Sequence, residues 1–179
     1  MATDLQSRVW FGICIYLVAS TALIYVALLP INMGPASWAG PDWLLLLALV
    51  VVIRRPKYAP VLAIALVFLL ADFIFQRPPA LWTVLVVWLT ELLRKRAPGF
   101  RSMPFSVEWT TVAGMILAVF AVNRLFLAIL IMPLPPLGLV VMQAVATALA
   151  YPIVSVLSRL VMGLRRTSVG ELDARGQRL

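Results

Sequence analysis

The sequence has no histidine, one cysteine and few charged residues, and these shortages limit the chemistry that the chain can perform. Without histidine it lacks the usual general base and the usual zinc ligand. The single cysteine, Cys14, cannot form a disulfide or a two-cysteine metal site within one chain, and its place in an apolar run predicts a packing role. Only 12% of the residues are charged. We therefore expect no catalytic residue, no metal site and no cofactor.

What the sequence has in excess is apolar residues, which make up 63% of a chain of 179 residues. A water-soluble fold of this size could not bury so much apolar surface. Six apolar stretches are separated by proline-rich or basic segments, and about 20 residues of helix cross a bilayer. The sequence predicts an all-α integral membrane protein, a bundle of six transmembrane helices with short second to fourth helices. The predicted helices are residues 9–29, 43–53, 61–75, 80–93, 107–132 and 137–162.

These helices form one predicted transmembrane domain over residues 1–162, followed by a short mobile cytoplasmic tail over 163–179. The first stretch is too long for the core of a signal peptide and is expected to remain in the membrane. The loops between the helices are too small to fold independently.

The charge pattern predicts how the helices cross the membrane. Fifteen Lys and Arg oppose seven Asp and Glu, but the cations lie in short clusters between apolar runs, which favours a topology signal over nucleic-acid binding. Six crossings with both termini in the cytoplasm place nearly all the clusters inside. The predicted cytoplasmic basic loops should meet anionic lipid, or alternatively a cytoskeletal partner. They contain Arg54, Arg55, Lys57, Arg94, Lys95, Arg96 and Arg101.

Few polar residues lie inside the apolar stretches, and each needs a partner or a purpose there. Asp72 lies near the outer end of the third predicted helix, and Asn123 and Arg124 lie in the outer half of the fifth. One hypothesis is that Arg124 pairs with Asp72, and the alternative is that Arg124 extends to the outer headgroups while Asp72 is hydrated. Glu91 is expected to pair locally with Arg94 or Lys95, and Glu108 suits the positive end of the fifth helix.

The last predicted helix carries a face of mostly small residues at three- and four-residue spacing. We interpret this face as a packing seam, whose partner is either internal or another protein, including a second copy of the chain. Pro152 lies beside the seam and leaves one carbonyl of its helix in need of another donor. The seam contains Ala144, Thr147, Ala148, Tyr151 and Ser155.

The order of these features resembles the MreD family of rod shape-determining proteins. The resemblance rests on Pro41-Asp42-Trp43 at the start of the second helix, Asp72 near the end of the third, and Tyr151-Pro152 in the last. The segment from Ala71 to Trp82, followed by Glu91-Leu92-Leu93-Arg94-Lys95-Arg96, is similar to forms found in alphaproteobacterial members.

The resemblance implies a non-enzymatic scaffold in the bacterial inner membrane that helps maintain cell shape during peptidoglycan synthesis. Its implied partners are the bitopic protein MreC, the actin-like MreB, and RodA with its class B penicillin-binding protein. The family fold is similar to that of the substrate-binding subunits of energy-coupling-factor transporters. The alternative function is therefore a membrane subunit that binds a small, vitamin-type molecule for transport.

Overall fold

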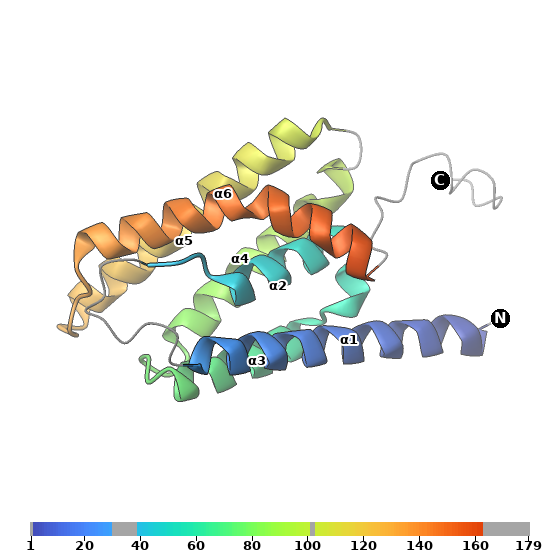
Figure 1. Ribbon diagram of the computed structural model, residues 1–179, viewed down its shortest axis with the longest axis horizontal. Helices are drawn as coiled ribbons and strands as arrows, with labels where there is room; N and C mark the ends of the chain where they lie inside the picture. Colours follow the sequence, from blue (N-terminus) through green and yellow to red (C-terminus); the bar gives the residue numbers. More distant parts are fainter. Residues whose placement is uncertain (1, 30–38, 101–102, 163–179) are drawn as a thin grey trace.

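The structure, a computed structural model, describes residues 2–29, 39–100 and 103–162. Within these ranges it contains helices and no strand. The predicted tail and Arg101 lie outside the described residues. Figure 1 shows the six α-helices, and a short 3-10 helix, η1 (Pro56–Tyr58), lies between α2 and α3. The α-helices are α1 (Ala2–Leu28), α2 (Trp43–Arg54), α3 (Val61–Ile74), α4 (Leu81–Phe100), α5 (Phe105–Ile129) and α6 (Leu137–Met162).

The fourth helix corrects one expectation from the sequence. α2 and α3 are short, with 12 and 14 residues, but α4 has 20 residues and continues well past the end of its apolar run. Glu91, Arg94, Lys95 and Arg96 are good helix formers, so hydropathy alone does not mark the end of the helix. Pro98 lies in the last turn of α4, where it cannot donate to the Arg94 carbonyl one turn earlier.

Three of the helices are long and apolar enough to cross a membrane, namely Val9–Leu28, Phe105–Ile129 and Leu137–Ser158. Large apolar side chains also cover the outside of the bundle, such as Val18, Leu62 and Ile153, each more than 60% exposed. In water this surface would cause association, so the molecule has the build of a helical membrane protein. Cys14 lies on the exposed face of α1, so its predicted role in internal packing is wrong.

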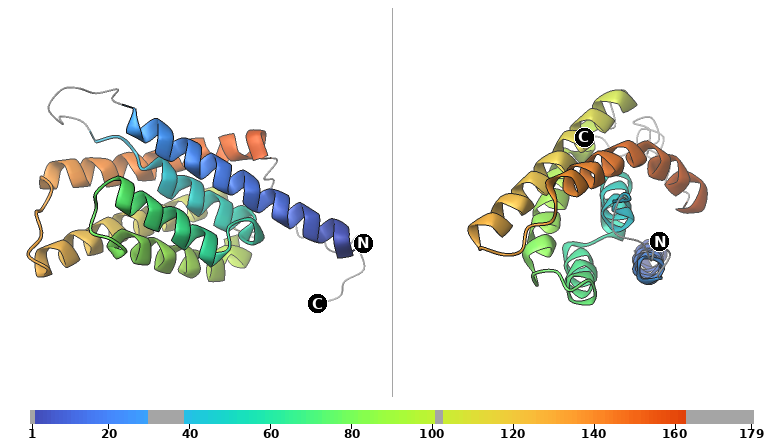
Figure 2. Two further views of the ribbon diagram at one scale, coloured as in Figure 1. Left: turned by 90° about the horizontal axis from the view of Figure 1, so that it is seen from below. Right: turned by 60° about the vertical axis from the view of Figure 1, so that its left-hand side comes forward.

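α2 is the centre of the bundle. All its residues from Leu44 to Arg54 are buried, and it packs against α1, α4 and α6. The right-hand view of Figure 2 shows it enclosed by these helices. A helix that is apolar on every side is expected to lie inside a fold, which explains why so short an element can be so hydrophobic.

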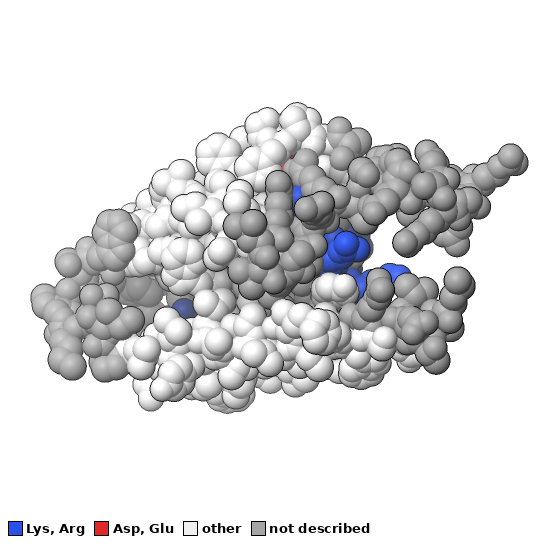
Figure 3. Space-filling view, turned by 45° about the vertical axis from the view of Figure 1, so that its right-hand side comes forward, with Lys and Arg blue, Asp and Glu red and all other residues white. Residues whose placement is uncertain are grey.

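The helices alternate in direction. α2 and α6 run parallel, because Asp42 before the start of α2 meets Thr147, and Arg54 at the end of α2 meets Ser155, which lies further along α6. α5 and α6 run antiparallel, since Arg124 donates a hydrogen bond to the Pro135 carbonyl beside their connection. We call the end at which α2, α4 and α6 finish the basic end, and the other the opposite end. Figure 3 shows Lys and Arg gathered at the basic end of a largely uncharged surface.

α1 packs against η1 through a glycine, which yields a first prediction. A Cβ at Gly12 would overlap the Tyr58 ring, so Gly12→Ala should lower the free energy of unfolding by about 2 kcal/mol through overpacking. Chemical unfolding in mixed micelles, followed by circular dichroism, measures the change. Gly114→Ala is the matched control, because a Cβ there meets open space and should be neutral or stabilising. Equal effects of the two variants would contradict this account.

Candidate functional site

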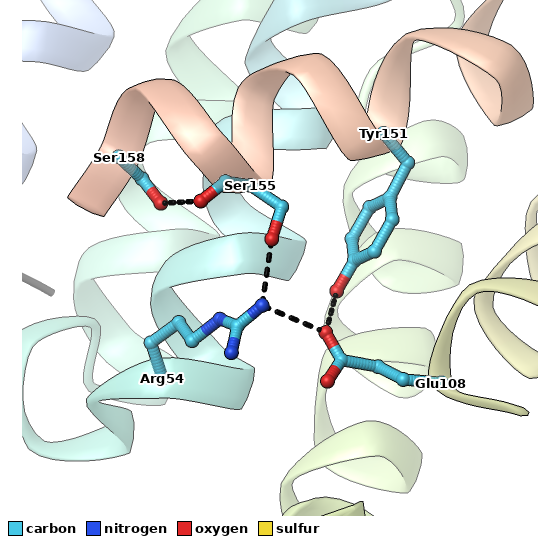
Figure 4. Close-up of polar contacts among 5 residues, drawn as sticks. All are labelled: Arg54, Glu108, Tyr151, Ser155 and Ser158. Carbon is cyan, nitrogen blue, oxygen red and sulfur yellow. Dashed lines mark hydrogen bonds and ion pairs between the residues drawn. The ribbon is translucent and has the colours of Figure 1, made fainter. Parts of the chain in front are cut away.

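A buried ion pair and its hydrogen bonds join three helices near the basic end (Figure 4). Arg54 Nη2 lies 3.0 Å from Glu108 Oε1, and the two side chains are 2% and 1% exposed. The same Arg54 nitrogen donates to Ser155 Oγ at 2.6 Å. The Tyr151 hydroxyl donates to Glu108 Oε1 at 2.7 Å. We call these four residues the polar knot.

Local sequence explains how the polar knot assembles. Arg54 is the last residue of α2, where a cation suits the negative end of the helix. Glu108 lies in the first turn of α5, where a carboxylate suits the positive end. Tyr151 and Ser155 are four residues apart on α6 and therefore share one face. The knot thus ties the ends of α2 and α5 to the middle of α6.

The structure corrects the sequence-based role of Arg54. It was placed in a cytoplasmic basic loop, but it is buried and held by the polar knot. Glu108 was expected only to complement its helix, and its pairing with Arg54 was missed. The available signal was a cation directly after an unbroken run of eleven apolar residues, a position that implies burial with a partner.

Arg94 is a second structural cation at the basic end. Its Nε donates to Glu91 Oε1 at 2.7 Å, which is the expected local pair. Its two terminal nitrogens donate to the carbonyls of Pro56 and Ala59, at 2.6 and 2.7 Å. Arg94 therefore fixes the α2–α3 connection to α4. Of the other predicted loop residues, Lys57, Lys95 and Arg96 are exposed and Arg55 is half-buried.

Neutralising the cations of α4 should separate a role in fold stability, expected of Arg94, from a role in binding anionic lipid, expected of Lys95 and Arg96. Arg94→Gln should lower the free energy of unfolding by about 2 kcal/mol, because two backbone carbonyls lose a charged donor. Lys95→Gln with Arg96→Gln should leave unfolding unchanged within about 0.5 kcal/mol and weaken binding to vesicles containing phosphatidylglycerol. Unfolding and vesicle sedimentation measure the two effects. An unstable Lys95/Arg96 double variant would contradict the separation.

The predicted seam on α6 lies inside the bundle. Ala144, Thr147, Ala148, Tyr151 and Ser155 are all buried. α6 packs against α2 and α5, so these residues serve as an internal packing face.

The half-buried Pro152 beside the seam also has its missing donor replaced. Proline at this position cannot donate to the Ala148 carbonyl one turn earlier. Trp109 Nε1 donates to that carbonyl instead, at 2.9 Å. The indole of α5 therefore compensates for the proline of α6.

At the opposite end, Asp72 caps a neighbouring helix. Its Oδ2 accepts hydrogen bonds from the backbone nitrogen of Thr83 at 3.1 Å and from the Thr83 hydroxyl at 2.7 Å. Thr83 is the third residue of α4, so Asp72 of α3 satisfies one of its unpaired amino-terminal donors. Asp72 is fully buried.

The hypothesis that Asp72 pairs with Arg124 is wrong. Arg124 Nη1 donates to the Pro135 carbonyl at 2.7 Å, so its partner is the α5–α6 connection. The carboxyl group is instead drawn to the start of α4, whose amide donors lie closer along the α3–α4 hairpin. Asn123 is half-buried and lines a cavity at this end.

α2 is fixed at its amino end as well. Asp42 Oδ1 accepts from the Leu45 backbone nitrogen at 2.9 Å, as an N-cap does. The Asp42 backbone nitrogen donates to Thr147 Oγ1 at 3.0 Å. Both ends of the central helix are therefore attached to α6 by polar contacts.

Comparison with known family models, curated proteins and solved structures finds no match for this chain. Function has to be argued from the site itself. In the part of the chain that the structure describes, no group of three potential metal ligands comes together. The polar contacts described above mainly join one helix, or the connection beside it, to another.

Proposed function

We propose that this chain is a non-enzymatic membrane scaffold of the bacterial cell-elongation complex, of the MreD type. The observation that supports the proposal is that the polar side chains hold the helices to one another. Arg54, Glu108, Asp72, Arg94 and Trp109 are each engaged with another helix or with an inter-helix connection. Such a body is suited to presenting fixed helix faces to partner proteins.

The proposed topology has six crossings, with both termini on the cytoplasmic side of the inner membrane. The alternating helix directions support it, because every loop at the basic end then lies on one side. Lys and Arg in short loops are retained in the cytoplasm, which assigns the basic end to that side. The short central α2 is accommodated because longer helices shield it from lipid.

The proposed partners are MreC, MreB, RodA and its class B penicillin-binding protein, and they follow from the sequence resemblance. The test is to tag the chain in its own cell and solubilise the membranes gently. We expect a bitopic MreC-like protein to copurify, and depletion of the chain to turn rods into spheres. An unrelated tagged multi-pass protein of similar size is the control. Unchanged shape with no copurifying partner would contradict the proposal.

A second candidate is a membrane subunit that binds a small molecule for transport. A cavity at the opposite end, which becomes the outer side in the proposed topology, favours it. This function requires uptake of a solute that depends on the chain. Loss of uptake with normal cell shape on depletion would select it over the scaffold.

A further inference from the structure

A cavity of about 730 Å³ opens at the opposite end of the bundle. It lies where α4 and α6 begin and α5 ends, which are brought together at this end in Figure 1. Phe120, Leu127, Leu139 and Val140 give it an apolar wall. The volume falls within the range of pockets that hold small organic ligands.

The polar side chains of this cavity include one cation, Arg77. Arg77 lines it, with its guanidinium carbon 5.2 Å from the centre of the Phe75 ring and 5.9 Å from that of Trp82. These rings hold the cation in place, and among the described residues it has no acidic partner. The amides of Asn123 and Gln143 add further donors on the α5 and α6 sides.

Trp82 places an unpaired polar atom beside the cavity. Its side chain lines the cavity and is 5% exposed, and its buried Nε1 has no hydrogen-bond partner in the part of the chain that the structure describes. A buried indole N–H usually has a partner, since leaving it unpaired costs about 1–3 kcal/mol.

The partial charges at the helix ends also bear on whether the cavity favours an anion or a cation. Its lining includes residues from the first turns of α4 and α6, and Asp42 at the start of α2. The carboxylates of Asp42 and Asp72 cap α2 and α4, so the positive end without an acidic cap is that of α6. The negative ends of α3 and α5 also lie nearby, but their turns occupy their carbonyls. Arg77 N donates to the Asp72 carbonyl, and Met132 N to that of Leu127. Among the described residues of the lining Asp42 is the only acidic one, and one of its oxygens is held by the α2 cap.

We propose that this cavity binds an anionic amphiphile, with its phosphate or carboxylate at Arg77 and its apolar part against Phe120, Leu127 and Val140. A neutral apolar ligand would leave the donors unpaired. A cation would meet Arg77 and the positive end of α6. The site does not rest on the scaffold function, because it is argued from the cavity alone.

The test uses decyl phosphate as the probe. The full chain is placed in nanodiscs of phosphatidylcholine, and binding of the radiolabelled probe is measured with empty nanodiscs subtracted. We expect saturable binding that weakens at least tenfold in Arg77→Gln, because the headgroup loses its charged donor. Arg124→Gln is the matched control, since that arginine lies at the same end of the bundle outside the cavity lining, and it should bind as the natural chain does.

A second variant keeps the test decisive if Arg77→Gln does not fold. Leu139→Trp fills the cavity without a change of charge and should abolish binding, while neutral decanol should compete poorly with the probe. Mass spectrometry of the purified chain then distinguishes the source of the natural ligand, because a membrane phospholipid and a soluble amphiphilic acid have different masses. Binding that is equal in all variants, or equally reduced in Arg124→Gln, would overturn the proposal.

Discussion

Replacement of Arg54 by Met, or of Glu108 by Leu, is expected to lower the free energy of unfolding by about 3–5 kcal/mol. Each change leaves one charge buried without its counter-charge, at a site where both side chains are at most 2% exposed. The remaining charge must then be neutralised or hydrated, and either change loosens α2 from α5 and α6. Unfolding in mixed micelles by circular dichroism measures the loss.

The double variant Arg54→Met with Glu108→Leu is the decisive comparison. We expect it to be more stable than either single variant, because no unpaired charge remains and apolar side chains fill the space. Glu91→Gln is the control, since it breaks the partly exposed pair with Arg94 and should cost no more than about 1 kcal/mol. A double variant whose loss equals the sum of the two single losses would show that the pair has no energetic coupling.

Asp72→Ala is expected to cost about 3 kcal/mol, because the Thr83 backbone nitrogen and hydroxyl both lose their acceptor in a buried position. Asp72→Asn should cost about 1 kcal/mol, since the amide oxygen can still accept while the favourable interaction with the positive end of α4 is lost. The same unfolding assay gives both values.

A double-mutant cycle attributes the Asp72 effect to the cap of α4. Once Asp72 is Ala, Thr83→Val should cost clearly less than it does in the natural chain, because the hydroxyl has already lost its partner. Thr21→Ala serves as a control, since that hydroxyl bonds only to the Leu17 carbonyl of its own helix on the exposed face. Additive effects of Asp72→Ala and Thr83→Val would contradict the contact.

The helices were predictable from sequence because an apolar run needs no knowledge of its neighbours. The runs ending at Leu29 and Met162 match α1 and α6 closely at those ends. The predicted fourth helix ended too early, because Arg94, Lys95 and Arg96 end the apolar run but not the helix. Hydropathy describes the surroundings of a segment, whereas helix formation depends on backbone pairing.

Pairing between distant residues was much less predictable. The local contact of Glu91 with Arg94 follows from a separation of three residues on one helix. The contact of Arg54 with Glu108 joins residues 54 positions apart, and nothing in a single sequence sets the rotation of α2 relative to α5. For the same reason Asp72 was assigned to a distant cation when its partner was the next helix in the hairpin.

The polar knot also has a consequence for the order of events during synthesis. Arg54 leaves the ribosome when Glu108 and Ser155 do not yet exist, and the second of these follows it by 101 residues. At common rates of translation this interval is on the order of ten seconds. The contact of Arg54 that fixes α2 to α6 can therefore form only after α6 has been synthesised. During that interval Arg54 needs water, headgroups or an insertion factor in place of its partners.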